Sequence, residues 1–238
     1  MKVFINNRNL LTWPKAMAEI LAAQGHEVVF IDNASTYPPL LGFYGSCPYR
    51  VARAHNGGPA TPWSVIGKQL EPYVVTDPDL DLSGVPPDWP EVLLEGLELS
   101  GVKCGFSIYD QDLPRASAPR NLDDPPTQAA HDSVWDQPIT GPRHGFFGYP
   151  VDTHFAVYDP TIAVHRIGGC RAAPPYTVRH LPWHVVLQHD PSDPAIQIEL
   201  DDEYRDYLES ATNGSSMRNL PYVQRMMGDY DLMKGKAK

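Results

Sequence analysis

Three aspartates alternate with other residues directly after a short apolar run, and this spacing suits the binding of a divalent cation. Tyr73–Thr76 contains two β-branched valines and predicts a buried strand, which Pro78 ends because proline cannot donate to a sheet. Asp77, Asp79 and Asp81 therefore follow the carboxyl end of this strand. Carboxylate oxygens bind hard divalent cations, and open α/β sheets bind ligands at this edge. The stretch predicts a cation site that holds a polyphosphate.

Two aspartates one residue apart also occur by chance in an acidic chain. The same spacing recurs at Asp110 and Asp112, and again at Asp229 and Asp231. Most such pairs are solvated loop carboxylates. Whether Asp77 and Asp79 form a binding site therefore depends on the elements around them.

The N-terminal segment predicts a β-α-β unit. An apolar strand at 2–5 ends in the polar turn 6–9, and a second apolar strand at 26–31 ends in the polar turn 32–36. Between them, an apolar stripe predicts a helix for which Thr12 is the expected N-cap. Such a unit has parallel strands and a right-handed crossover.

A third strand is expected at 49–53, and it ends in the turn 55–59, which contains two glycines. Short helices are expected on either side of it, at 37–44 and 62–68. Because the carboxyl ends of parallel strands meet at one edge of a sheet, four polar turns outline one crevice. This clustering distinguishes Asp77 and Asp79 from the aspartate pairs that occur by chance.

The rest of the chain gives weaker signals. A segment at 110–145 is rich in proline, and loops of that length are usually functional or mobile. The C-terminal residues carry several lysines and arginines and predict a solvated tail. The expected elements are helices at 90–99 and 201–210 and strands at 102–109, 151–158 and 162–167.

Composition limits the class of protein. The chain has 238 residues, which is enough for one substantial core. Its net charge of −10 counts against a general polyanion binder, because affinity for nucleic acids rests on Lys and Arg. Cys47, Cys104 and Cys170 are far apart and odd in number, which favours reduced thiols in a cytoplasmic protein. Neither a signal peptide nor a stretch apolar enough to span a membrane is evident.

The motifs, taken in order, resemble the nucleotide-sugar glycosyltransferases of the GT-A fold, especially family 2. Two later stretches, Asp152-Thr-His-Phe-Ala and Arg179-His180-Leu-Pro-Trp183, are also similar, the second to a short, phage-type subgroup in which a histidine completes the metal site. The residues that carry the main resemblance are Asn6-Asn7-Arg8, Ile31-Asp32-Asn33-Ala34-Ser35-Thr36, Asn56-Gly57-Gly58 and Thr76-Asp77-Pro78-Asp79.

The resemblance implies a fold and a division of the chain. The fold is α/β, of the Rossmann-like GT-A type, with a mostly parallel central sheet flanked by helices and a small antiparallel second sheet. Residues 1–238 would form one domain. Within it, 1–109 is the expected nucleotide-binding half, 110–200 the acceptor-side half, and 201–238 a C-terminal helix and tail.

The resemblance also implies roles for single residues. Asp32 would accept the imide N–H of a uracil base, and the two glycines would let the backbone approach the nucleotide closely. Asp77, Asp79 and His180 would hold Mn²⁺ or Mg²⁺, and Asp152 would be the catalytic base. The implied nucleotide-binding residues are Asn6, Asn7, Arg8, Asp32, Asn56, Gly57, Gly58 and Asp77.

The implied reaction is transfer of a sugar from a nucleotide diphosphate, a UDP-sugar, to a hydroxyl acceptor such as a polysaccharide or a hydroxymethylated DNA base. Two alternatives stay open, namely a sugar nucleotidyltransferase and a non-catalytic sugar-nucleotide-binding protein. The first usually has a glycine-rich loop after its first strand, and the turn 6–9 contains no glycine. The spacing of His180 and His184 does not predict structural zinc, because Pro182 breaks the helix that would be required.

Overall fold

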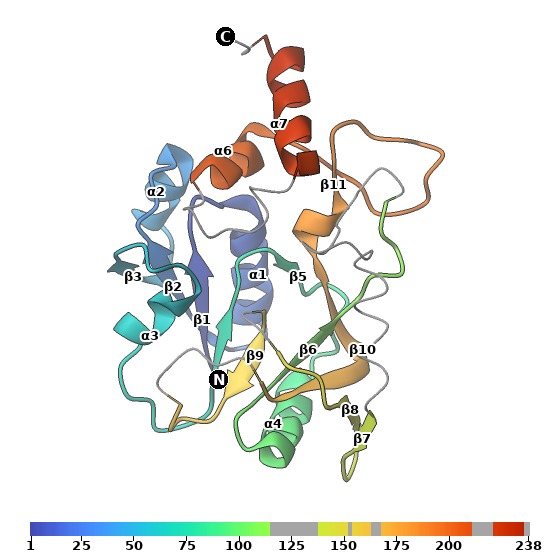
Figure 1. The fold of residues 1–238 in the computed structure, drawn as a ribbon. Coiled ribbons are helices and arrows are strands. Elements are labelled where there is room, and N and C mark those ends of the chain that lie inside the picture. The colour runs from blue at the N-terminus through green and yellow to red at the C-terminus, as the bar shows by residue number, and fades with distance from the viewer. Residues whose placement is uncertain (115–137, 152–153, 163–167, 211–220, 236–238) are drawn as a thin grey trace.

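The computed structural model describes residues 1–114, 138–151, 154–162, 168–210 and 221–235, and of 221–226 only the backbone. In this part of the chain the central sheet has ten strands. Nine of them lie in the order β3-β2-β1-β4-β9-β6-β10-β8-β7, and β5 pairs with β10 (Figure 1). The strands are β1 (Lys2–Asn7), β2 (Glu27–Asn33), β3 (Arg50–Ala54), β4 (Tyr73–Thr76), β5 (Leu80–Asp81), β6 (Lys103–Ile108), β7 (Pro138–Thr140), β8 (Gly145–Phe147), β9 (Ala156–Tyr158) and β10 (Cys170–His180).

The N-terminal half of the sheet is wholly parallel, as predicted. β1 pairs in parallel with both β2 and β4, and β2 pairs in parallel with β3. In the order β3-β2-β1-β4 the sheet grows first to one side of β1 and then to the other. The switch point of this α/β arrangement therefore lies between β1 and β4, where ligands of such sheets bind.

Helices cover both faces of this half, and alternate residues of β1 show it. Val3 and Ile5 pack in the cluster that contains the buried residues of α1 (Thr12–Ala23), α2 (Pro38–Tyr44) and α4 (Trp89–Ser100). Phe4 points to the opposite face, where Trp63 and Val65 of α3 (Thr61–Val65) pack. This alternation follows from the two-residue period of a strand.

The C-terminal half of the sheet is mixed. β9 lies antiparallel between β4 and β6, and β10 runs parallel to β6. The sequence pattern did not predict β10, because Pro174 and Pro175 interrupt its apolar residues. The register with β6 shifts between Ala172 and Thr177, so the prolines lie where the ladder is already broken.

The small second sheet is parallel, so the expected antiparallel arrangement is wrong. It consists of β11 (Val185–Val186) and β12 (Ile198–Glu199). The segment 187–197 between them acts as a crossover, which lets the second strand run in the same direction as the first. The antiparallel pairs of the described chain belong instead to the central sheet, where β7 and β8 form a hairpin beside β10.

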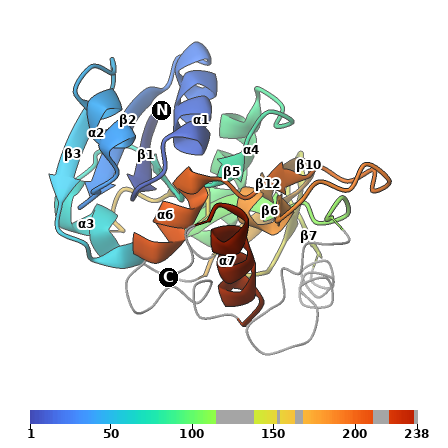
Figure 2. The ribbon, with the colours of Figure 1, turned by 90° about the horizontal axis from the view of Figure 1, so that it is seen from above.

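Two C-terminal helices lie at the carboxyl edge of the parallel strands, α6 (Asp202–Ser210) and α7 (Pro221–Met233) (Figures 1 and 2). The first is the predicted acidic helix, whereas the second stands where a solvated tail was expected. The guanidinium of Arg205 joins them through Asp231, at 2.6 Å from Nε to Oδ1. Across the described ranges, we find no helix with the length and apolarity that a membrane crossing requires.

Candidate functional site

The fold brings Asp79 next to His180, although the two residues lie far apart in the sequence. β5 pairs antiparallel with the end of β10, and His180 lies opposite Leu80 in this register. The backbone N–H of Leu181 also donates to the carbonyl oxygen of Asp79, at 2.9 Å. As a result, Nε2 of His180 lies 3.6 Å from Oδ2 of Asp79.

Asp79 is buried and His180 is partly buried, and neither neutralises a charge on the other. Burial raises the pKa of Asp79 to about 7. Burial also lowers the pKa of His180 to about 3, assisted by the charge of His184. The imidazole is therefore neutral at pH 7, so the pair is not an ion pair despite its short separation. Oδ1 of Asp79 and Nδ1 of His180 are buried and have no hydrogen-bond partner among the residues that the structure describes. Such groups are costly to bury, and a bound cation would offset that cost.

Asp77 follows β4 directly, and its charge acts on Tyr207 of α6. Burial raises the pKa of the Tyr207 phenol well above its ordinary value, and the charges of Asp79 and Asp77 raise it further. Tyr207 is therefore close to both carboxylates.

The described residues do not form a complete protein cage for a metal ion. Among the residues that the structure describes, no three His, Cys, Asp or Glu side chains form a group that could hold an ion. Asp79 and His180 supply an oxygen and a nitrogen at one point. Mg²⁺ is commonly held by one or two carboxylates together with substrate phosphates and water, so the residues present fit a cation that is shared with a phosphorylated ligand.

The polar turns meet at the carboxyl edge, as the sequence predicted. Nδ2 of Asn6 donates to the carbonyl oxygen of Gly58, at 3.2 Å, and Nδ2 of Asn33 donates to the same oxygen, at 3.3 Å. The backbone N–H of Gly57 donates to Oδ1 of Asn33, and that of Gly58 to Oδ1 of Asn56. Gly58 has a φ of 60°, in the left-handed region that favours glycine. The ends of β1, β2 and β3 thus form one connected polar surface.

Asn7, Asp32 and Arg8, which were also predicted to bind the nucleotide, have side-chain partners within the protein. Nδ2 of Asn7 donates to the carbonyl oxygen of Leu10, at 2.7 Å, and lies 2.9 Å from the Tyr44 hydroxyl. Asn7 is fully buried. This side chain therefore shapes the turn after β1 from inside.

Asp32 and Arg8 are engaged in the same way. One carboxylate oxygen of Asp32 accepts the backbone N–H of Ser35, at 3.0 Å, and the other accepts Nη1 of Arg53, at 2.9 Å. Nη1 of Arg8 donates to the carbonyl oxygens of Asn33 and Ala34, at 2.8 and 2.7 Å. These contacts hold the turn after β2. Asn6, by contrast, lies on the side of Gly58, to whose carbonyl oxygen it donates.

Helix α6 is docked onto the turn after β1. The carboxylate of Glu203 accepts the backbone N–H groups of Leu11 and Thr12 and the hydroxyl of Thr12. Nδ2 of Asn9 donates to Asp206, at 3.0 Å. Thr12 is not the N-cap that its side chain predicted: Leu11 occupies that position and makes no side-chain cap, because Glu203 provides the acceptor from outside the helix.

Beside the Asp79–His180 pair lies a second polar group that the sequence did not single out as a unit. Arg179, Asp112 and His184 form it, and the charges of Asp112 and Arg179 both act on the imidazole of His184. Asp112 recurred in the chance aspartate pairs, and His184 was considered only as a zinc ligand. No local spacing could indicate this group, because it depends on how β10 runs beside β6.

The predicted base, Asp152, lies outside the described residues. Two residues later in the sequence, His154 is buried, and its Nε2 lies 3.0 Å from the carbonyl oxygen of Phe106.

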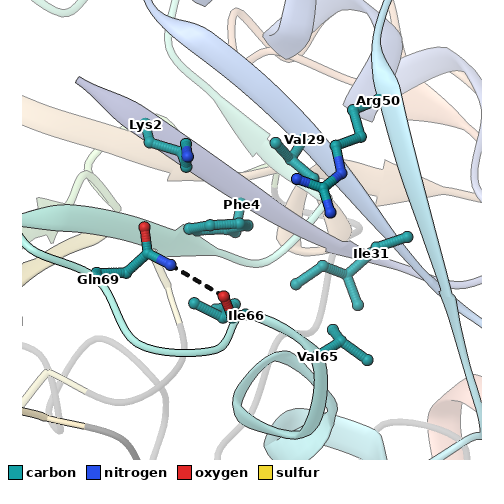
Figure 3. Close-up of a pocket in the computed structure, with 9 residues that line it drawn as sticks. Lys2, Phe4, Val29, Ile31, Arg50, Val65, Ile66 and Gln69 are labelled. Atoms are coloured by element: carbon teal, nitrogen blue, oxygen red, sulfur yellow. Dashed lines mark hydrogen bonds between the residues drawn. The ribbon is translucent and has the colours of Figure 1, made fainter.

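A pocket of about 60 Å³ lies between β1, β2, β3 and the segment after α3 (Figure 3). Phe4, Val29 and Ile31 form its apolar wall, and Lys2 and Arg50 lie at its rim. Its volume is far below the several hundred Å³ of a typical ligand pocket. It also contains none of the predicted site residues, so the carboxyl edge is the better candidate for a functional site.

No protein-family model matches the chain, and neither a curated protein nor a solved structure matches it.

Proposed function

We propose that the protein is a metal-dependent glycosyltransferase that moves a sugar from a nucleotide diphosphate, most simply a UDP-sugar, to a hydroxyl acceptor. The observation that carries this proposal is the pair formed by the buried Asp79 and the partly buried His180. One oxygen of the Asp79 carboxylate receives no hydrogen bond from the described part of the chain, and the imidazole of His180 beside it is neutral. Burying these atoms without a partner costs free energy, and a divalent cation bound between them would offset this cost.

The place of the pair in the sheet supports a nucleotide as the ligand. Asp77 and Asp79 follow β4, and Asn6 ends β1, so the two groups border the switch point of the sheet. Gly57 and Gly58 lie at the same edge, where backbone without side chains can approach a ribose or phosphate. One site can thus hold a nucleoside on one side and its diphosphate on the other.

In this proposal Mn²⁺ or Mg²⁺ would bind Asp79 and His180 and stabilise the negative charge of the departing diphosphate. Asp77, beside the pair, would orient the ribose or a metal-bound water. Asn6 and Asn56 would contact the nucleoside. Asp152 remains our proposed base for the acceptor hydroxyl.

The test is a thermal unfolding series with UDP. UDP at about a hundred times its dissociation constant should add roughly 2.7 kcal/mol of stability with Mn²⁺ present and little with excess chelator. Asp79→Asn should abolish this metal dependence without lowering the melting temperature of the metal-free protein, because it removes an uncompensated buried charge. Equal shifts with metal and with chelator would contradict the proposal.

Asp229→Asn is the matched control, because Asp229 belongs to a second aspartate pair of the same spacing and is exposed on α7. It should leave the metal-dependent shift intact. Activity is checked in the same series by incubating UDP-glucose with Mn²⁺ in water. Slow metal-dependent release of UDP that Asp79→Asn abolishes would indicate a transferase and distinguish it from a protein that only binds nucleotide sugars.

A further inference from the structure

His184 presents a buried acceptor that nothing in the described protein satisfies. The side chain is fully buried, and its Nδ1 lies 3.2 Å from the carbonyl oxygen of Ile196. A carbonyl oxygen only accepts, so Nδ1 carries the proton and Nε2 offers a lone pair. Nε2 is buried and has no hydrogen-bond partner among the described residues. An acceptor in this condition is normally satisfied by a donor from ordered water or from a bound molecule.

Asp112 offers a second acceptor of the same kind. Its Oδ2 accepts Nε of Arg179 at 2.7 Å, whereas its Oδ1 is buried without a partner in the described chain. Nη1 of Arg179 also reaches Asp81, at 3.5 Å, and the guanidinium lies 5.3 Å from the centre of the Tyr109 ring. Arg179 is therefore held from three sides, and it fixes the orientation of the Asp112 carboxylate.

The two acceptors adjoin the Asp79–His180 pair. His184 ends the 3₁₀ helix η3 (Leu181–His184), which begins directly after His180. Four residues of a 3₁₀ helix span roughly 8 Å, which is close to the width of one sugar ring with its substituents. Asp81, the second partner of Arg179, is two residues from Asp79. A molecule bound at the cation pair could therefore extend to His184 and Asp112.

The chemistry of this group selects neutral donors. A cation is disfavoured because Arg179 already supplies positive charge to both Asp112 and Asp81. No three-ligand metal group exists in the described residues, which also counts against a second ion. Hydroxyl groups meet the requirement, since each brings one donor, and buried acceptors without partners discriminate strongly for ligands that supply it.

We propose that His184 and Asp112, oriented by Arg179, form a subsite that binds two hydroxyl groups of a sugar ring. This subsite rests on the proposed function, because its place beside the cation pair makes it part of a glycosyl-transfer site. The ring belongs either to the donor sugar or to the acceptor. Both rings carry the same hydroxyl groups, but the donor sugar binds together with UDP, whereas the acceptor binds separately.

Two variants test the subsite separately. His184→Asn keeps a side-chain donor near the carbonyl oxygen of Ile196 and removes the Nε2 acceptor. Asp112→Asn keeps the size of the side chain and removes its charge. Asp159→Asn, the same change in a turn at the end of β9, is the control. The probes are UDP, UDP-glucose and methyl β-D-glucopyranoside, each with Mn²⁺, measured by calorimetry.

If the ring is that of the donor, both subsite variants should bind UDP-glucose about tenfold to a hundredfold more weakly and bind UDP normally. If it is that of the acceptor, UDP-glucose binding should stay normal and binding of the methyl glucoside should weaken by the same factor. Unchanged binding of all probes in Asp112→Asn, folded as judged by its melting temperature, would overturn the subsite and leave ordered water as its occupant.

The subsite and the proposed function fail in different ways. Absence of UDP and UDP-glucose binding to the unaltered protein would contradict the proposed function. In that case the methyl glucoside still tests the subsite, by ligand-observed saturation-transfer NMR. A signal that both subsite variants abolish and Asp159→Asn retains would support it, and no signal would overturn it.

Discussion

Glu95 is a buried carboxylate of α4 that ties the β7–β8 hairpin to the helix. It accepts hydrogen bonds from the backbone N–H groups of Arg143 and His144 and from Nε of Arg143, and Nδ1 of His144 lies 2.8 Å away. Burial alone would raise the pKa of Glu95, but these hydrogen bonds outweigh burial and lower the pKa from 4.5 to about 2.

A carboxyl group whose pKa falls on folding stabilises the fold above its unfolded pKa and loses that contribution as the pH falls through its folded pKa. We therefore expect Glu95 to stabilise the protein fully above about pH 4.5 and to lose this contribution between pH 4.5 and about 2. Glu95→Gln should be less stable than the unaltered protein at pH 6. Its urea unfolding midpoint should fall less between pH 4.5 and 2, so the two curves converge. Parallel curves over this range would contradict the assignment.

At the scale of elements, α6 acts as the external cap of α1. Glu203 accepts two backbone N–H groups at the start of α1 and the hydroxyl of Thr12, and its negative charge lies at the positive end of that helix. Glu203→Ala should therefore lower the free energy of unfolding by about 1 to 2 kcal/mol, the usual cost of a lost N-cap. Denaturant unfolding measures this change.

Glu203→Ala should also speed hydrogen exchange of residues 202–210, because α6 would be held less firmly over Asp77 and Asp79. Glu209→Ala is the control on the same helix. Glu209 is exposed and pairs only with Arg205 among the contacts described, so its loss should cost under about 1 kcal/mol. Equal losses in the two variants would show that α6 is not docked through Glu203.

The sequence predicted correctly those elements whose signals lie within a few neighbouring residues, and it missed those that depend on distant segments. Tyr73–Thr76 matches β4 residue for residue, because two valines and the following proline define it locally. The family resemblance placed Asp79 and His180 in one site, and the pairing of β5 with β10 brings them together. By contrast, the capping of α1 by Glu203 joins segments distant in sequence, and no spacing encodes it. β10 was missed because its two prolines resemble a loop, although a break in the ladder accommodates them.

The candidate site was predictable to the same extent. The position of Asp79 at the carboxyl edge followed from strand polarity. The hydrogen-bond partners of the candidate site residues within the protein could not be predicted. The two carboxylate oxygens of Asp32, which was expected to bind a base, accept hydrogen bonds from Ser35 and Arg53. His184 and Asp112 could not be singled out from the sequence. They are candidates only because Nε2 of His184 and Oδ1 of Asp112 receive no donor from the described residues, which depends on how the chain packs.

At the scale of the whole molecule, net charge separates the two classes of acceptor. The chain carries −10 at pH 7. Binding to duplex DNA depends on Lys and Arg that neutralise phosphates and release counterions, so a strongly acidic protein meets repulsion at most approaches. A polysaccharide without charge meets none. We therefore expect a neutral carbohydrate, and not hydroxymethylated DNA, to be the acceptor.

The measurement is fluorescence anisotropy with a labelled duplex that contains 5-hydroxymethylcytosine, in the presence of UDP and Mn²⁺. At 150 mM NaCl we expect a dissociation constant no tighter than about 100 μM, the weak end of non-specific binding. A labelled neutral glucan serves as the comparison in the same buffer. Binding of the duplex at or below about 1 μM that weakens steeply with salt would contradict this expectation, because it would require a local basic surface strong enough to overcome the net charge.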